Sequence, residues 1–307
     1  MAKVGMVPSI EKTESTRRMR DAFARQGVPA IEFDCSEIFK NEGEVRSEEA
    51  RMNFEHNLRR TGVDVVYLRQ STHVISLAET IEHEGLKAVP SSAALKLTGN
   101  KVKMLKALKG AGIPIPKTAF ADDSPADWQA VVGNALPKTY VVKDEKTVNG
   151  ETVGLKSTPA VQPPFEYLPK FFGKPIVQEK LDVLDDFRTY IIGDELITYK
   201  RIRKEGEWKA NYQFLDLQYP VTTPKDVREI VTKIRDTFNL EYCGVDLCRA
   251  RDGKVYVFEL NSIAAIPKGN VADCVVSWLA QLPGGVSDES ETEECDCDDG
   301  NCGEGGQ

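Results

Sequence analysis

The sequence predicts a protein of mixed α/β and α+β class, with a parallel sheet in its N-terminal part. Residues 1 to about 90 alternate short apolar segments with amphipathic segments, the rhythm of βαβ units in a parallel sheet covered by helices. Later residues instead contain tight hairpin signals, at Gly193-Asp194-Glu195 and at Asp252-Gly253, which are typical of antiparallel strands. The 307 residues suffice for a large core and for more than one domain.

Glycines mark the ends of the helices in the N-terminal part. Gly27, Gly62 and Gly85 each end an amphipathic segment. The expected elements are strands at residues 4–7, 28–33, 64–68 and 87–89 and helices at residues 13–26, 47–60 and 75–84. No glycine-rich dinucleotide fingerprint follows the first strand, so a nicotinamide-binding domain is not expected.

The middle of the chain begins with a helix that Asn100 is expected to cap, which places Lys101 at its first position. Ser124-Pro125 opens a further helix, because proline suits the first turn. Strands are expected at residues 139–143 and 175–179, and the first of them is followed by a polar loop over residues 144–155.

The last third of the chain combines strands with two helices. Strands are expected at residues 187–192, 196–202, 208–212, 244–247 and 255–261. Thr223 is expected to cap a helix, with Pro224 in its first turn and Asp226 closing a capping box. A final helix is expected at residues 271–282, and the chain beyond it lacks apolar residues and is expected to be disordered.

Three side chains with oxygen atoms lie in the apolar strands around Asp252-Gly253. Glu259 and Asn261 are two residues apart and project to the same face of a strand, and antiparallel pairing can bring Asp246 beside them. Carboxylate and amide oxygens suit Mg²⁺, which usually takes one or two carboxylates together with substrate phosphates. The alternative is an edge hairpin whose acids point to water.

Two lysines stand where a phosphate is readily bound. Lys101 begins a helix, whose free N–H groups attract anions, and Lys143 ends a strand before a loop that contains Gly150 and Gly154. That loop lacks the Gly-Lys-Ser/Thr ending of a P-loop. The alternative for either lysine is a solvated surface charge.

Asp186, Arg188 and Arg201 lie on consecutive strands of the first hairpin. Asp186 and Arg188 share a face, and Arg201 can meet them across the strand pair. Arginine suits bidentate contacts with phosphate or carboxylate groups. The alternative is a cross-strand salt bridge, which contributes little if it is exposed.

The net charge of −8 comes from the C-terminal residues. Residues 287–307 contain nine acids and no Lys or Arg, so the rest of the chain has 40 basic and 39 acidic residues and gives no indication of nucleic-acid binding. Cys295, Cys297 and Cys302 lie among those acids. We interpret them as part of a solvated tail, with a site for a soft metal as the alternative.

The sequence favours a cytoplasmic location. It has no apolar run long enough to span a bilayer, and we interpret its N-terminus as a strand rather than as a signal peptide. The other four of its seven cysteines are scattered in apolar or mixed stretches, which is typical of reduced thiols.

Taken in order, these motifs resemble the ATP-grasp superfamily, and they are most similar to its RimK-type carboxylate–amine ligases. The resemblance covers residues 1 to 282 in organisation. It rests on the Asn100-Lys101 helix, the segment 112–118, Lys143 with its glycine loop, Gln178-Glu179 at a hinge, Asp186-Phe187-Arg188, Arg201, Lys209-Ala210-Asn211, Asp246, Glu259 and Asn261.

The resemblance implies an ATP-grasp fold in three parts. A pre-ATP-grasp βαβ domain at residues 1–92 would precede a central subdomain at residues 93–178 and a C-terminal subdomain at residues 179–282, followed by the acidic, cysteine-containing tail at residues 283–307.

The resemblance also implies roles for individual residues. ATP would lie between the two subdomains, and Mg²⁺, or Mn²⁺ in its place, would bind Asp246, Glu259 and Asn261. Arg188 and Arg201 would be the catalytic residues, stabilising the charge of an acylphosphate. The implied ATP-binding residues are Lys101, Lys143, Gly150, Gly154, Gln178, Glu179, Lys180, Asp186, Lys209 and Asn211.

The implied reaction is an ATP-dependent C–N ligation that releases ADP and phosphate. The acid would be a small molecule or the C-terminus of a peptide or protein, and the amine an amino acid. No nucleic-acid or membrane partner is expected, and a homo-oligomer stays open. Residues 212–215 and 262–266 depart from the family pattern in regions that would line the substrate pocket, so glutamate is not carried over as the amine.

Two rival interpretations keep the same ATP-binding residues. An ATP-grasp kinase would transfer phosphate to a hydroxyl group and would release no free phosphate. A non-catalytic nucleotide-binding module would not require the complete set of Asp246, Glu259 and Asn261.

Overall fold

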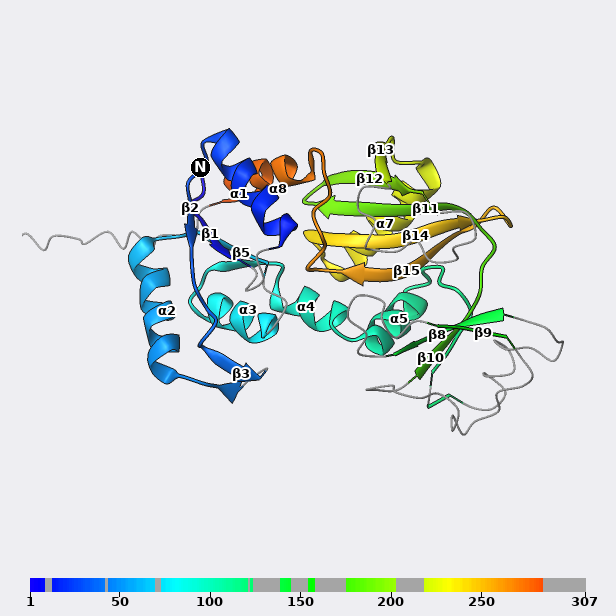
Figure 1. Cartoon of the computed structure of the whole chain (residues 1–307), viewed down its shortest axis with the longest axis horizontal. Coiled ribbons are helices and arrows are strands. Elements are labelled where there is room, and N and C mark those ends of the chain that lie inside the picture. Colours follow the sequence, from blue (N-terminus) through cyan, green and yellow to red (C-terminus); the bar gives the residue numbers. More distant parts are fainter. Residues whose placement is uncertain are drawn as a thin grey trace, which may run out of the picture.

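The computed structural model describes residues 1–8, 13–41, 44–69, 73–120, 122–123, 139–144, 154–157, 175–202 and 218–283. Its strands form a four-stranded parallel sheet, antiparallel sheets of four and of five strands, and a two-stranded ribbon, with helices around and between them (Figure 1). The parallel sheet lies at one end of the molecule, and the four-stranded and five-stranded antiparallel sheets lie at the other. We call these two the smaller and the larger antiparallel sheet. None of the helices in these residues has the length and apolar character that crossing a membrane requires. The predicted mixed α/β and α+β class is confirmed.

The N-terminal residues form the predicted parallel sheet, in the strand order β2-β1-β5-β6. Its elements are β1 (Val4–Val7), α1 (Glu14–Gln26), β2 (Ala30–Glu32), α2 (Glu48–Thr61), β5 (Val65–Leu68), α3 (Val74–His83) and β6 (Lys87–Val89). Thr13 and Ser47 cap α1 and α2 by accepting backbone N–H groups, and Gly27 and Gly62 end them in the left-handed region. The ribbon of β3 (Phe39–Asn41) and β4 (Glu44–Val45) was not predicted.

Two short helices, α4 (Ser92–Thr98) and α5 (Lys101–Gly110), lead into the smaller antiparallel sheet. The Asn100 side chain accepts the N–H of Lys103 and caps α5, as predicted. The sheet has the order β7-β10-β8-β9, with β7 (Thr118–Phe120), β8 (Thr139–Asp144), β9 (Gly154–Ser157) and β10 (Pro175–Glu179). The loop predicted over residues 144–155 is wrong at its end, because Gly154 already pairs with Val142 as part of β9.

The larger antiparallel sheet has the order β13-β12-β11-β14-β15. Its strands are β11 (Val183–Ile192), β12 (Glu195–Arg201), β13 (Gln218–Val221), β14 (Tyr242–Ala250) and β15 (Val255–Asn261). The two predicted hairpins, β11–β12 and β14–β15, are confirmed. The helix predicted at Ser124-Pro125 and the strand predicted at residues 208–212 lie outside the described residues.

Helix α7 (Lys225–Phe238) covers one face of this sheet. The predicted capping of α7 is wrong, because Pro224 occupies the N-cap position and makes no side-chain cap. The Thr223 hydroxyl instead lies 2.9 Å from that of Thr198 on β12, and the Asp226 carboxylate accepts N–H groups from Arg249 on β14. Tertiary contacts thus replace the local capping box.

The last helix, α8 (Val271–Gln281), packs against α1 (Figure 1). The Ala2 N–H donates to the Ala280 carbonyl over 3.1 Å, and Arg25 pairs with Asp273 over 2.8 Å. A single buried cluster combines apolar residues of β1 and α1 with those of α8 and with Tyr190 of the larger antiparallel sheet. The two ends of the described chain therefore share one core.

Candidate active site

Strand alternation gives the larger antiparallel sheet two different faces. On β11, Phe187 and Ile191 pack with the apolar residues of α7, whereas Tyr190 belongs to the core shared by α1 and α8. Asp186 and Arg188 have the same parity as Tyr190, so they lie on the face away from α7. We call this the site face.

The strand register aligns the predicted residues across four neighbouring strands. Asp186 on β11 lies opposite Arg201 on β12, and Arg188 lies opposite Asp246 on β14. Asp246 in turn lies opposite Glu259 on β15. The register shifts after this pair, and such a bulge changes the direction of nearby side chains. The predicted hairpin geometry around Asp246 is confirmed.

Asp246 lies at the centre of a network of buried charges. Its Oδ2 accepts hydrogen bonds from Arg188 Nη1 and, over 3.1 Å, from Asn261 Nδ2, while its Oδ1 accepts from Arg201 Nη1 over 2.9 Å. Arg201 Nε also donates to Asp186 Oδ1 over 2.6 Å. These contacts are cross-strand ion pairs, which the sequence analysis gave as the alternative to a binding role. They are buried rather than exposed, since the Asp246 and Asp186 side chains are 14% and 5% exposed.

The ionisation of the network follows from these contacts. Burial opposes the charged form of Asp246, but the guanidinium groups of Arg188 and Arg201 outweigh burial and hold its pKa below the ordinary value of 3.8. Burial likewise opposes the charge on Arg188, and Asp246 raises the pKa of that guanidinium. All three groups are therefore ionised at neutral pH.

Lys101 joins this network from the first position of α5. Its Nζ lies 3.0 Å from Glu259 Oε1, so the lysine reaches the site face rather than solvent. We define the site cluster as Lys101, Asp186, Arg188, Arg201, Asp246, Glu259 and Asn261. Its three cations and three carboxylates balance one another.

The donor set of the site cluster fits a magnesium ion that also binds substrate phosphates. Glu259 and Asn261 flank Asp246, and together they offer two carboxylates and an amide. Within the described ranges, no group of three or more His, Cys, Asp or Glu side chains could hold a metal by itself. Mg²⁺ needs only one or two carboxylates when phosphates complete its shell. The assignment of Asp246, Glu259 and Asn261 as metal ligands stays a prediction.

The other predicted ATP-binding residues lie on or beside the smaller sheet, or outside the described part. The Gln178 side chain is buried and donates to Thr118 Oγ1 over 2.9 Å. Glu179 accepts the Lys117 N–H through its side chain and donates its own N–H to the Lys117 carbonyl, and Lys180 follows it at the surface.

Of the remaining predictions, Lys143 is located in β8 and Gly154 begins β9. Gly150, Lys209 and Asn211, together with the cysteines of the tail, lie outside the described residues. Their assigned roles stay predictions.

Gly244 is a residue of the site that the sequence analysis did not single out. It lies on β14 opposite Tyr190. A Cβ atom at this position would lie 2.8 Å from the Ala264 Cβ and 2.9 Å from Arg188 Nε. Only glycine leaves room for the guanidinium of Arg188, and a glycine inside an apolar strand was the available signal.

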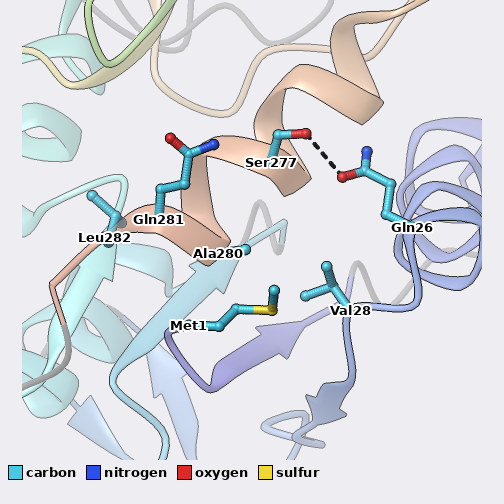
Figure 2. Close-up of a pocket in the computed structure, with 7 residues that line it drawn as sticks. All are labelled: Met1, Gln26, Val28, Ser277, Ala280, Gln281 and Leu282. Carbon is cyan, nitrogen blue, oxygen red and sulfur yellow. Dashed lines mark hydrogen bonds between the residues drawn. The ribbon is translucent and has the colours of Figure 1, made fainter.

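A pocket of about 690 Å³ lies elsewhere, between α1, the segment before β2 and α8 (Figure 2). Met1, Val28, Ala280 and Leu282 line it together with three neutral polar side chains, and Ser277 Oγ lies 2.9 Å from Gln26 Oε1. None of the lining side chains carries a charge. None of the predicted site residues in the described part of the chain lines this pocket.

Comparisons with known proteins identify relatives over most of the chain. Residues 98–272 match the model of the RimK-like ATP-grasp domain family. A probable alpha-L-glutamate ligase of Photobacterium profundum is 26% identical over 294 residues, which cover 90% of this chain and 95% of that protein. A probable alpha-L-glutamate ligase of Pseudoalteromonas translucida is 27% identical over 271 residues, covering 85% of this chain and 87% of that protein.

Solved structures share the fold at low sequence identity. A RiPP-associated ATP-grasp ligase of Chryseobacterium gregarium, in complex with ADP and a leader and core peptide, superposes with a TM-score of 0.65 at 13% identity, over 92% of this chain and 98% of its own. The N5-carboxyaminoimidazole ribonucleotide synthetase of Thermotoga maritima has a TM-score of 0.62 at 15% identity, over 93% of this chain and 77% of its own. The family match spans more than half of the 307 residues. The chain therefore belongs to the RimK-like ATP-grasp family, and it is an ATP-dependent ligase of the carboxylate–amine class.

Proposed function

We propose that this ligase joins the carboxylate of a small molecule, or of a peptide or protein C-terminus, to the amine of an amino acid, with Mg-ATP as the energy source. The single observation that carries the proposal is the buried alignment of Arg188, Arg201 and Asp246 on the site face. Two arginines held at one buried carboxylate are suited to bind a reaction partner that carries several negative charges.

The chemistry requires little covalent help from the protein. An oxygen of the substrate carboxylate attacks the γ-phosphorus of ATP, and ADP leaves, which gives an acylphosphate. The amine nitrogen then attacks the carbonyl carbon, phosphate leaves and the nitrogen loses a proton. Bound Mg²⁺ would supply neutralisation of the phosphate charge.

The protein side chains would orient these groups and stabilise their charge. Arg188 and Arg201 would donate to the oxygens of the transferred phosphoryl group and of the acylphosphate, while Lys101 would bind a phosphate of ATP. Asp186 would hold Arg201 in place, because the two side chains lie 2.6 Å apart. No Ser–His or Cys–His nucleophile is required by this mechanism.

The relatives support an amino acid as the amine, since those reported above are named alpha-L-glutamate ligases. Glutamate itself is one candidate among several, because residues 262–266 depart from the pattern of the family. Peptides belong among the acceptors to be tested, because a structure of the same fold holds a leader and core peptide. We further propose a cytoplasmic location and activity with Mn²⁺ in place of Mg²⁺.

The test is phosphate release from Mg-ATP, measured with each of the twenty amino acids and with pooled carboxylate acceptors, peptides included. We expect phosphate release that requires both an amino acid and an acceptor and that is lost in Glu259→Ala. An acceptor labelled with ¹⁸O in its carboxylate should transfer one ¹⁸O atom to the released phosphate, because that oxygen bridges the acylphosphate.

Two results would contradict the proposal. ADP formation without free phosphate would favour a kinase that keeps the phosphoryl group on its product. Tight binding of ATP without turnover, across all acceptor and amino-acid pools, would favour a nucleotide-binding module.

A further inference from the structure

In the loop that follows Asn261, the carbonyls of residues 264–266 accept hydrogen bonds from side chains on three separate segments of the chain. The Ala264 carbonyl accepts from Arg69 Nη1 over 2.6 Å, and the Ala265 carbonyl accepts from the Tyr190 hydroxyl over 2.7 Å. The Ile266 carbonyl accepts from Arg18 Nη1 over 2.6 Å. We call residues 262–270 the 262–270 loop. It begins directly after a predicted metal ligand, so it borders the site cluster.

The two arginines that hold this loop differ in how their charge is compensated. Arg18 lies 3.3 Å from Glu14 Oε1, and its side chain is 13% exposed. Arg69 is 5% exposed and has no carboxylate within ion-pair distance among the described residues. Its Nε atom is buried and has no hydrogen-bond partner in that part of the chain. Arg69 is therefore a buried cation without an acidic partner there.

The guanidinium of Arg69 is charged at neutral pH, because arginine is not deprotonated in proteins. A buried charge with an unsatisfied N–H group is costly in free energy. Hydrogen bonds that the guanidinium donates to neutral acceptors, such as the Ala264 carbonyl, offset this cost less completely than a carboxylate would.

The position of Arg69 connects it to the site cluster. It directly follows β5, at the carboxyl ends of the parallel strands, where α/β folds commonly bind ligands. The guanidinium of Arg188 lies 5.6 Å from the centre of the Tyr190 ring, and the Tyr190 hydroxyl binds the carbonyl next to the one that Arg69 binds. Tyr190 and the dipeptide of residues 264–265 thus connect Arg69 to Arg188 of the site cluster.

We propose that Arg69 binds the α-carboxylate of the amino acid that supplies the amine. This carboxylate takes no part in the reaction. The inference rests on the proposed function and sharpens it, because it restricts the amine to compounds with a free α-carboxylate. The carbon of that carboxylate is two bonds from the attacking nitrogen. The α-carboxylate of an amino acid whose amine lies at the site cluster must therefore bind close to that cluster. The free Nε is one of the atoms that a side-on arginine–carboxylate pair uses.

The experiment compares an amino acid with its α-amide as the amine substrate. L-Glutamate is tried first and the other nineteen amino acids next, and the α-amide of the active amino acid is then assayed for phosphate release. The wild type should prefer the free acid in kcat/KM by about 100-fold, because a site built for a charged group rejects an analogue that lacks it.

Variants at the two loop-binding arginines separate recognition from loop positioning. In Arg69→Gln we expect the KM of the free acid to rise by about 100-fold and the kinetics of the amide to stay near the wild type, so that the preference is lost. Arg69→Lys should retain part of the preference. Arg18→Gln is the matched control, because it removes a donor to the same loop without removing the uncompensated cation, and it should keep the preference.

A second measurement covers the case in which a variant fails to fold. Arg69→Met removes a buried charge that has no carboxylate partner among the described residues, but it also removes the donor to the Ala264 carbonyl, so its melting temperature without substrate first shows whether the variant folds. The amino acid should raise the melting temperature of the wild type in Mg-ATP and leave that of Arg69→Met unchanged.

Three outcomes would overturn the inference while the proposed function stands. These are a wild type that uses acid and amide equally, an Arg69→Gln variant that slows both equally, and an Arg18→Gln variant that loses the preference to the same extent. Failure of the proposed function would look different, because the wild type would then release no phosphate with any amino acid.

Discussion

Two charged clusters lie back to back on the same strands, and their contrast separates stability from function. One is the site cluster. The other, which we call the α7-side cluster, comprises Asp185, Lys200, Asp226 and Arg249. Asp185 pairs with Lys200 over 2.6 Å and with Arg249 over 2.8 Å, and Arg249 pairs with Asp226 of α7 over 2.7 Å. Asp185 and Asp186 are sequence neighbours, as are Lys200 and Arg201, so strand alternation alone assigns them to different faces.

The clusters differ in exposure and in what they connect. In the α7-side cluster the side chains of Lys200 and Asp226 are 37% and 43% exposed, and the ion pairs tie a helix to the sheet. Arg249 also lies over the ring of Phe187, 5.5 Å from its centre. The side chains of the site cluster are more deeply buried, and among the described residues only the pair of Lys101 and Glu259 joins a helix to the sheet there. Because burying charges costs free energy that pairing only partly returns, stability does not account for the site cluster. We therefore expect substitutions there to affect catalysis most.

The largest expected effect is at the centre of the site cluster. Asp246→Asn removes the carboxylate that Arg188 and Arg201 share, and we expect amine-dependent phosphate release to fall by at least about 1,000-fold. The melting temperature should also fall, because two buried guanidinium groups lose their acidic partner. Asp226→Asn is the matched control, and it should retain at least about half of the activity. Similar activity losses in the two variants would contradict the contrast between the clusters.

Neighbouring cations on β12 provide the second comparison. Arg201→Met should lower kcat by about 100- to 1,000-fold, because a donor to the charge that develops in the transition state is lost. Lys200→Met, on the opposite face, should change kcat by less than about 2-fold, as expected for a partly exposed ion pair. Both values come from steady-state phosphate release at saturating Mg-ATP. A larger fall in kcat for Lys200→Met than for Arg201→Met would contradict the assignment, because it would indicate that the reaction takes place on the α7 side of the sheet.

A smaller effect is expected where the sheet makes room for Arg188. Gly244→Ala introduces a Cβ atom that would lie 2.8 Å from Ala264 and 2.9 Å from the Arg188 guanidinium. Overpacking of this kind destabilises a protein by about 1–3 kcal/mol, which urea unfolding can measure. We expect kcat to fall by about 10-fold as Arg188 shifts. Unchanged stability and activity would show that the neighbouring loop yields without cost.

The smallest effect concerns pH and the α7-side cluster. Hydrogen bonds from Lys200, together with those from Arg249, outweigh burial and hold the pKa of Asp185 below its ordinary value of 3.8. Asp185 therefore stabilises the fold above the pKa of the unfolded chain, and this contribution is lost as the pH falls through the lower folded pKa. Asp185→Asn should cost about 1 kcal/mol at neutral pH, because its partner Lys200 is partly exposed and Arg249 keeps its pair with Asp226, and it should flatten the fall of urea midpoints in acid. An unchanged acid profile would refute this linkage.

The sequence was most informative where local pattern and topology agree. Two-residue spacing and the Asp252-Gly253 turn were enough to predict Asp246 beside Glu259 and Asn261, and the Asn100 cap was predicted from its side chain alone. Strand alternation also brought Asp186 and Arg201 together as predicted. These features depend on neighbours in the chain, so a single sequence contains them.

Features that depend on distant partners could not be predicted. Thr223 and Asp226 form a capping box by pattern, but Thr198 and Arg249 engage their side chains instead. The burial of Arg69 without a carboxylate partner among the described residues depends on which side chains the fold gathers around it. The closeness of Gly244 to Arg188 likewise depends on the packing of Ala264. Such contacts are set by the tertiary structure.

The most direct test of the central claim, that the site cluster holds Mg-ATP, needs no knowledge of the acid or the amine. Calorimetric titration with ATP, with and without Mg²⁺, should be carried out on the wild type, Glu259→Gln and Asp226→Asn. We predict that Glu259→Gln weakens the Mg²⁺-dependent part of ATP binding by at least about 10-fold, since one carboxylate ligand is lost. Asp226→Asn should bind as the wild type does. Equal Mg²⁺-dependent binding in all three proteins would contradict the assignment of the site cluster.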